Sequence, residues 1–216
     1  EEIKKTPASF DRSVQPPRGP DVSVTVPPVW KSSLANGMKI YGIQHSEVPL
    51  VQYNIVIDGG HMLDDISAPG VANMLAMMLN EGTANKTPEE LEEEIALLGA
   101  MIRVSANAEN ITVSVNTLAR NFEKTLAIVE EMLLQPRWDS LSFELAKTRT
   151  LNGLRRSSID PTYLGSMALN RLILGKDNIF STDVSGTPES VNAMTMEQIR
   201  EYYEKYISPS VAHFLV

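Results

Sequence analysis

Cysteine is absent from this 216-residue chain. Its absence excludes disulfides, thiolate metal ligands and a cysteine nucleophile, and it leaves the redox compartment of the protein open. A basic surface is missing as well, because the formal net charge is −8. Proteins that bind nucleic acids carry a basic face, so the charge argues against that class, and plain solubility accounts for it.

Long apolar runs are also lacking. The most apolar stretch, residues 70–83, is about three helical turns long, which is well short of a membrane span. The chain starts with Glu1 and shows no signal peptide, so we expect a segment of a longer protein. With 43% hydrophobic and 21% charged residues, the composition predicts one large globular domain, or a domain with an arm.

The stretch between Gly70 and Thr83 predicts a buried helix. Its apolar residues point in nearly every direction around a helix, and a helix that is apolar on all sides is buried. Pro69 and Gly70 open it, and Gly82 closes it. The apolar residues are Val71, Ala72, Met74, Leu75, Ala76, Met77, Met78 and Leu79.

The frame Gly-x-Ala-x-x-x-x-x-Met-Leu-x-x-Gly-Thr in this stretch resembles the core helix of the pitrilysin/insulinase-type zinc peptidases. In active members of that family the helix carries His-x-x-Glu-His, which supplies two zinc ligands and a general base. On this sequence the two His positions fall on Asn73 and Met77, and the Glu position falls on Ala76. The resemblance therefore implies a peptidase core helix without its catalytic groups.

The same resemblance places a third zinc ligand, a Glu, on a later helix ahead of an Asp-Pro turn. The matching frame puts it at Gly153, and a second carboxylate seven residues earlier falls on Ala146. Catalytic zinc needs three protein ligands and an activated water, and the water needs a base. Asn73 is at best a weak ligand, so we expect no metal and no catalytic residue in this segment.

The three histidines are the remaining candidates for metal chemistry. We expect His45, His61 and His213 to be surface or loop residues, because none has a second ligand at helical spacing. His61 precedes Asp64 and Asp65 in an apparent loop, and these three residues are the first place to look for a new catalytic site. No Gly-x-Ser-x-Gly elbow and no phosphate-binding Gly-rich loop is present.

Hydrophobic periodicity predicts an α+β fold. The family resemblance implies an antiparallel sheet with helices packed on one face, the pitrilysin-type or LuxS-like αβ domain, and a truncated last strand. We expect strands near residues 38–44, 50–58, 101–106, 111–118 and 211–216. We expect helices at 70–83, from Pro88 to Gly99, from Asn121 to Pro136, from Asp139 to Ser158, from Pro161 to Leu174, at Pro188 and from Thr195 to Tyr206.

Residues 1–30 are expected to form a Pro-rich interdomain linker, and residues 31–216 a peptidase-type domain that is incomplete at its C-terminal end. Proline removes backbone donors and favours extended chain, so the arm is not a packed helix. The arm holds six of the 13 prolines, namely Pro7, Pro16, Pro17, Pro20, Pro27 and Pro28.

The resemblance implies a non-catalytic domain that shapes a peptide-binding chamber. It would face an active, zinc-containing domain of the same chain or of a partner subunit, with a peptide as substrate, and long bacterial relatives suggest the periplasm. An alternative is a structural or partner-binding scaffold without proteolysis, as in the core subunits of a respiratory complex. We also expect that an open sheet edge at the truncated last strand allows homo-oligomers.

Overall fold

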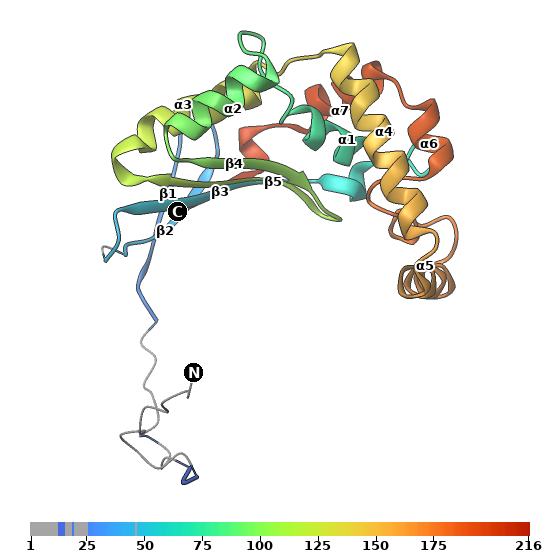
Figure 1. Cartoon of the computed structure of the whole chain (residues 1–216), viewed down its shortest axis with the longest axis horizontal. Coiled ribbons are helices and arrows are strands. Elements are labelled where there is room, and N and C mark those ends of the chain that lie inside the picture. The colour runs from blue at the N-terminus through green and yellow to red at the C-terminus, as the bar shows by residue number, and fades with distance from the viewer. Residues whose placement is uncertain (1–12, 16–18, 20–25, 46) are drawn as a thin grey trace, which may run out of the picture.

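The computed structural model describes residues 13–15, 19, 26–45 and 47–216. Most of the expected Pro-rich arm lies outside the described residues. The described part folds as a mixed α+β structure, with a single sheet and helices packed against one of its faces (Figure 1). The predicted fold class is confirmed.

The sheet has six strands in the order β1-β2-β6-β3-β5-β4. All neighbours are antiparallel except β2 and β6, which run parallel. The strands are β1 (Val29–Ser33), β2 (Lys39–Ile43), β3 (Leu50–Asp58), β4 (Met101–Ala106), β5 (Asn110–Leu118) and β6 (Ala212–Leu215).

Two features of the sheet differ from the expectation. Strand β1 was not predicted, and it begins two residues before the expected start of the domain at residue 31. The last strand, β6, does not leave an open edge, because it lies between β2 and β3 and pairs with both. The proposal that this strand mediates homo-oligomers is therefore wrong. The outer strands of the sheet are β1 and β4.

The helices follow the predicted order closely. Helices α2 and α3 lie over the sheet, whereas α1, α4, α6 and α7 gather at one end of it, and α5 projects beyond them (Figure 1). No described helix is long and apolar enough to cross a membrane. The bounds are α1 (Val71–Met78), α2 (Pro88–Leu97), α3 (Phe122–Leu134), α4 (Ser140–Ser157), α5 (Pro161–Leu174), α6 (Pro188–Ala193) and α7 (Met196–Tyr206).

The hydrophobic core lies between one face of the sheet and the helices. In β3, Tyr53, Ile55 and Ile57 are buried, and they alternate with Asn54 and Val56 on the other face. Strand β5 repeats this pattern with Ile111, Val113 and Val115. This period of two is the pattern of a sheet that buries a single face.

Helix starts are fixed by side chains that the sequence identifies. Thr87 and Thr195 each form a capping box, with Glu90 and Gln198 respectively. In such a box, two backbone N–H groups that the helix leaves unpaired gain partners. Asp139 caps α4 by accepting from the N–H of Ser142 at 2.8 Å.

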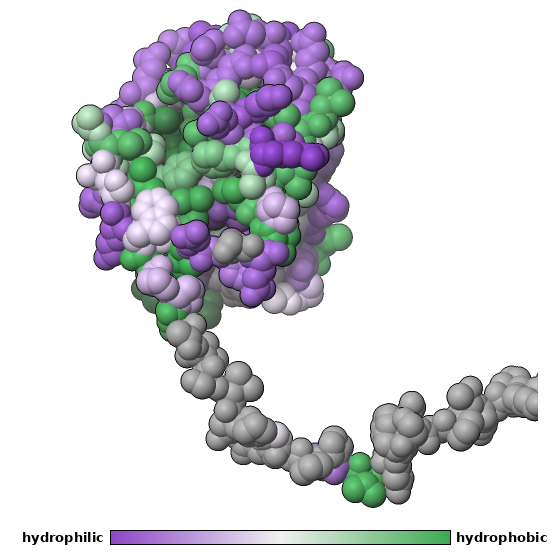
Figure 2. Space-filling model, turned by 90° about the vertical axis from the view of Figure 1, so that its left-hand side faces the viewer, coloured by the Kyte–Doolittle hydropathy of each residue, from purple (hydrophilic) through white to green (hydrophobic). Residues whose placement is uncertain are grey.

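An apolar groove of about 1030 Å³ lies between the core face of the sheet and the helices α3 and α7. Trp30 and Leu34 line it from the N-terminal side, and Phe214 and Val216 line it from β6 and the residue after it. Figure 2 shows the molecule from the left-hand side of Figure 1, where apolar residues gather between polar ones.

Candidate functional site

Helix α1 is held in place by a buried carboxylate at its N-terminus. Asp64 accepts from the backbone N–H of Gly70 at 2.8 Å and from that of Ala72 at 2.9 Å. Free N–H groups and the helix dipole make this end of a helix favourable for a negative charge. Gly70 has φ 101°, and a Cβ there would lie 2.7 Å from the carbonyl oxygen of Ser185, so only glycine fits.

Three of the positions singled out in the sequence line one small pocket. Asn73 and Met77 lie one turn apart on α1, and Gly153 faces them from α4. The pocket has a volume of about 270 Å³. An added Cβ at Gly153 would meet no atom within 4 Å, so open space lies in front of this position. Helix α1 is therefore not buried on every side as expected, because Asn73 and Met77 are half-buried.

The other two positions do not reach the pocket. Ala76 is 1% exposed and Ala146 is fully buried, and neither lines the cavity. Both belong to the core cluster, where α1 and α4 pack against each other. A methyl group at each position fits that close packing.

The side chains around the pocket do not fit a zinc ion. The sulfur of Met77 accepts from the hydroxyl of Thr150 at 3.4 Å and lies 3.9 Å from the amide nitrogen of Asn73. Zinc in proteins is bound by thiolate, imidazole and carboxylate groups. Here one carboxylate, that of Asp183, lines the pocket, and the other polar groups are an amide, hydroxyls and the guanidinium of Arg149.

The histidines are not brought together. His45 is exposed near Glu47, and His213 lies beside Asp58 with its Nε2 3.5 Å from the carboxylate. His61 corrects our expectation, because it is 1% exposed rather than at the surface. It lies in a short 3₁₀-helix, η1 (Gly60–Leu63).

The proposed cluster of His61, Asp64 and Asp65 also separates. Nδ1 of His61 lies 2.9 Å from the buried carboxylate of Asp64. Asp65 instead accepts from the backbone and the hydroxyl of Ser67 in an exposed turn, which lowers the pKa of the Asp65 carboxyl. None of the three residues lines the cavities described here, so the geometry offers no support for a new catalytic site.

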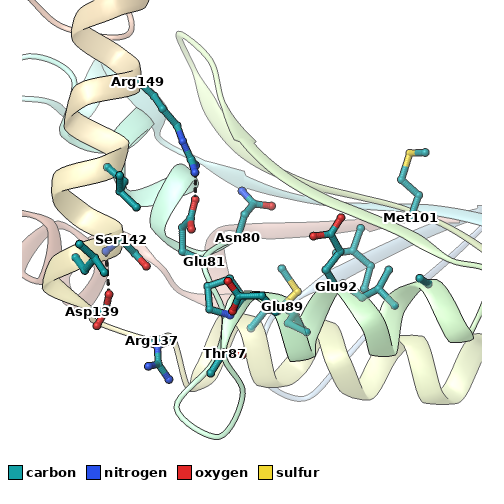
Figure 3. A pocket seen from close by; sticks show the side chains of 18 of the residues that line it. Asn80, Glu81, Thr87, Glu89, Glu92, Met101, Arg137, Asp139, Ser142 and Arg149 are labelled. Atoms are coloured by element: carbon teal, nitrogen blue, oxygen red, sulfur yellow. Dashed lines mark hydrogen bonds and ion pairs between the residues drawn. The ribbon is translucent and has the colours of Figure 1, made fainter.

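A larger groove adjoins the small pocket. It has a volume of about 840 Å³ and runs between α2, the start of β4 and the N-terminal half of α4 (Figure 3). Arg149 lines both cavities, and its guanidinium pairs with the carboxylate of Glu81 at 2.7 Å. The groove is rich in acidic groups, since Glu89, Glu92 and Asp139 also line it.

The outer strand β4 forms one side of this groove. Asn80 follows α1, and its amide makes two bonds to Val104 of β4: Nδ2 donates to the carbonyl at 2.9 Å, and Oδ1 accepts from the N–H at 3.0 Å. Because backbone groups alternate along a strand, Ile102 points its N–H and C=O the same way as Val104 does. Ile102 lines the groove.

Asn80, Glu81 and Arg149 were not predicted from the sequence. One signal was available for Asn80, because a lone amide directly after the fully buried Leu79 needs a partner. Nothing local indicates the pair between Glu81 and Arg149, since 68 residues separate them in the chain.

Comparison with known proteins identifies a family. Residues 42–160 match the insulinase family, peptidase family M16. The "non-peptidase homolog YmxG" of Helicobacter pylori is 21% identical over 158 residues, which is 73% of this chain and 36% of the relative. Cytochrome b-c1 complex subunit 1 of Caenorhabditis elegans is 21% identical over 189 residues, which is 88% of this chain and 40% of the relative.

The fold agrees with solved structures. The inactive domain of a peptidase M16 from Pseudomonas fluorescens superposes with a TM-score of 0.82 and 24% identity, over 87% of this chain and 46% of the other. At this identity the likeness shows the fold alone. This chain therefore spans less than half the length of the relatives that it matches.

Proposed function

This chain belongs to the insulinase family, peptidase family M16, and from that membership we propose that it is a non-catalytic domain which shapes a peptide-binding chamber. In this proposal an active domain of the parent chain, or of a partner subunit, holds the zinc and hydrolyses the peptide. The domain described here contributes walls and contacts to the chamber but no catalytic group.

One observation carries the proposal. The pocket between α1 and α4 brings together the three family ligand positions, Asn73, Met77 and Gly153, and none of them offers a zinc-binding side chain. The pocket is present, but these three positions supply no side chain that binds zinc. The description of two relatives as "inactive domain" and "non-peptidase homolog" supports the same conclusion.

The groove beside the pocket supports contact with a peptide. A groove that runs along an outer strand favours extended chain, because the strand edge offers backbone donors and acceptors to it. In β4 these groups include those of Ile102, whereas Asn80 already pairs with Val104. The exposed carboxylates of Glu89 and Glu92 in its lining favour peptides with basic side chains.

The test combines cleavage and binding on the isolated chain. With a library of fluorescence-quenched basic peptides as substrates, we expect the chain to show no chelator-sensitive hydrolysis. With the same peptides, we expect hydrogen exchange of β4 and α2 to slow as the peptide concentration rises. Chelator-sensitive hydrolysis by the purified chain contradicts the non-catalytic part of the proposal.

A pair of matched variants locates the binding. Ala96 is exposed on α2 and lines the groove, so Ala96→Arg fills the groove without disturbing the core. Ala168 is equally exposed on α5 and lies away from the groove, so Ala168→Arg is its control. We expect Ala96→Arg alone to abolish the protection of β4. Equal binding by both variants contradicts a peptide site in this groove.

A second function deserves a test, because one relative is a subunit of the cytochrome b-c1 complex. In this alternative the domain is a structural scaffold, and neither its parent chain nor its partners contain an active site. Purifying the full-length protein with its partners and measuring zinc and peptidase activity separates the two functions. Zinc-dependent cleavage in that assembly supports the chamber, and inactivity of the whole assembly supports the scaffold.

A further inference from the structure

His61 connects two segments that lie far apart in the sequence. Its Nδ1 faces the carboxylate of Asp64 at 2.9 Å. Its Nε2 lies 3.0 Å from the carbonyl oxygen of Ile179 and 3.1 Å from the hydroxyl of Thr182, in and directly after the 3₁₀-helix η3 (Ile179–Ser181). The imidazole therefore joins the start of α1, through Asp64, to a segment more than 100 residues away.

The partners of His61 fit an imidazole that carries a proton on both ring nitrogens. A carbonyl oxygen only accepts, so Nε2 must donate to Ile179. The hydroxyl of Thr182 donates to the same carbonyl at 2.7 Å, which leaves its oxygen to accept from Nε2 as well. Both oxygens of the Asp64 carboxyl group accept from backbone N–H groups, and Nδ1 faces this group at 2.9 Å. These contacts fit an imidazolium that donates from Nδ1 to Asp64 and from Nε2 to Ile179.

Both segments that His61 joins lead to residues that line the small pocket. Asp64 caps α1, which carries Asn73 and Met77 into the pocket. The segment that His61 holds continues directly to Asp183 and Ser185, which line another part of the pocket wall. Loss of the second proton would set the lone pair of Nδ1 against the carboxylate at 2.9 Å and replace attraction with repulsion.

We propose that His61 is a pH-sensitive clamp, which holds residues 179–185 against the start of α1 while its imidazole is doubly protonated and releases this wall of the pocket when it loses a proton. The inference rests on the contacts of His61 and holds whether or not the adjoining groove binds peptides. It adds a control over the shape of the pocket to the role proposed above.

The acidic groups around His61 favour its protonated form. Burial by itself lowers the pKa of His61, but the hydrogen bond and charge of Asp64 outweigh it, together with the Ile179 carbonyl and the charge of Asp183, so the pKa is raised. Tyr202 faces the site from α7, and burial keeps it neutral by raising its pKa.

From α5, Tyr163 bonds to Asp183, and burial together with this bond raises the pKa of Tyr163 to about 12. Arg171 lies near the same segment, with its Nε 3.5 Å from the carbonyl oxygen of Ser181. Tyr163 and Tyr202 therefore stay neutral throughout the range in which His61 titrates.

The direction of the pH effect follows from the raised pKa. A free histidine titrates near 6.5. Below that pH His61 is protonated in both the closed and the open state, and the clamp contributes fully to closure. As the pH rises through the higher value of the closed state, the contribution is lost. Between these two values the closed state holds one proton more than the open state, so the opening constant of residues 179–185 grows by up to about tenfold per pH unit and levels off above the closed-state value.

Nitrogen-15 NMR of the unaltered chain tests the clamp directly. At pH 6.5 we expect His61 to show two protonated ring nitrogens. Above pH 6.5 we expect it to lose a proton together with changes in the amide signals of residues 179–185. A single protonated nitrogen on His61 at pH 6.5 overturns the proposal, and so does a titration that leaves those amides unmoved.

Hydrogen exchange provides the second measurement, with a matched pair of histidine variants. After correction for intrinsic exchange, residues 179–185 should lose protection as the pH rises from 6.5 to 9, whereas α3 should not. His61→Gln should flatten this pH dependence. His45→Gln, which changes an exposed histidine, should leave it intact. A slope that persists in His61→Gln overturns the proposal. If that variant does not fold, the NMR titration of the unaltered chain decides.

Discussion

At the scale of single residues, position 77 shows how the small pocket is packed. The sulfur of Met77 is contacted by the Thr150 hydroxyl and the Asn73 amide. A thioether is a soft, adaptable group that packs in irregular space. Met77 thus fills part of the pocket, and Gly153 leaves open space in front of its own position.

Tyr53 allows a test of the core at the same scale. It is fully buried between Phe122 and Phe214, and its hydroxyl has no hydrogen-bond partner among the described residues. Burial raises its pKa to about 12. An unpaired buried hydroxyl is costly, so Tyr53→Phe should raise the free energy of unfolding by about 1 kcal/mol in urea denaturation.

A second tyrosine is the control for this prediction. The hydroxyl of Tyr202 donates to the carbonyl of Gly60 at 2.7 Å in a buried position. Tyr202→Phe removes this buried hydrogen bond and should lower the free energy of unfolding by about 1 kcal/mol. Opposite signs for the two variants support the account, and a loss in both contradicts the unpaired state of Tyr53.

Residues could be predicted from the sequence where a local rule or a motif fixes them. The capping pairs at Thr87 and Thr195 follow from spacing alone, and the family frame selects Asn73, Met77 and Gly153, which the structure brings to one pocket. His61 escaped prediction because its second partner, Ile179, is 118 residues away.

At the scale of elements, glycines on two helices should respond in opposite ways. Gly153 lies inside α4 with no atom within 4 Å of an added Cβ, and glycine is about 1 kcal/mol worse than alanine in a helix. Gly153→Ala should therefore stabilise the chain by 0.5–1 kcal/mol, measured as a higher midpoint in thermal or urea unfolding.

Gly70 is the contrasting position, at the start of α1. Its φ of 101° and the Ser185 carbonyl 2.7 Å from an added Cβ make any side chain strained. Gly70→Ala should destabilise the chain by more than 1 kcal/mol. A Gly153→Ala variant that also loses stability would mean that α4 packs against this position more closely than the structure shows.

Strand β1 shows why one element could not be predicted. All five of its residues are exposed, so it lacks the alternation that marks a strand with one buried face. Its existence depends on pairing with β2 rather than on its own pattern. Strands β3 and β5, in contrast, alternate clearly and were predicted to within a residue.

At the scale of the whole molecule, strand order is the property that local sequence carries least. The last strand, β6, is inserted between β2 and β3, which are consecutive in the chain. Its hydrophobic pattern fixes its conformation and its buried face but not its neighbours. Our expectation of an open edge there was therefore wrong, whereas the edge that adjoins the candidate groove, β4, is partly covered by Asn80.

The measurement that tests the central claim most directly is the zinc content of the purified chain after dialysis against trace zinc. We expect none to be retained, because the pocket lacks zinc-binding side chains at Asn73, Met77 and Gly153. The matched variant N73H/M77H/G153E, which leaves the buried Ala76 untouched, should gain tight binding. Stoichiometric zinc with sub-micromolar affinity in the unaltered chain would contradict the account, since its ligands would then have to lie elsewhere.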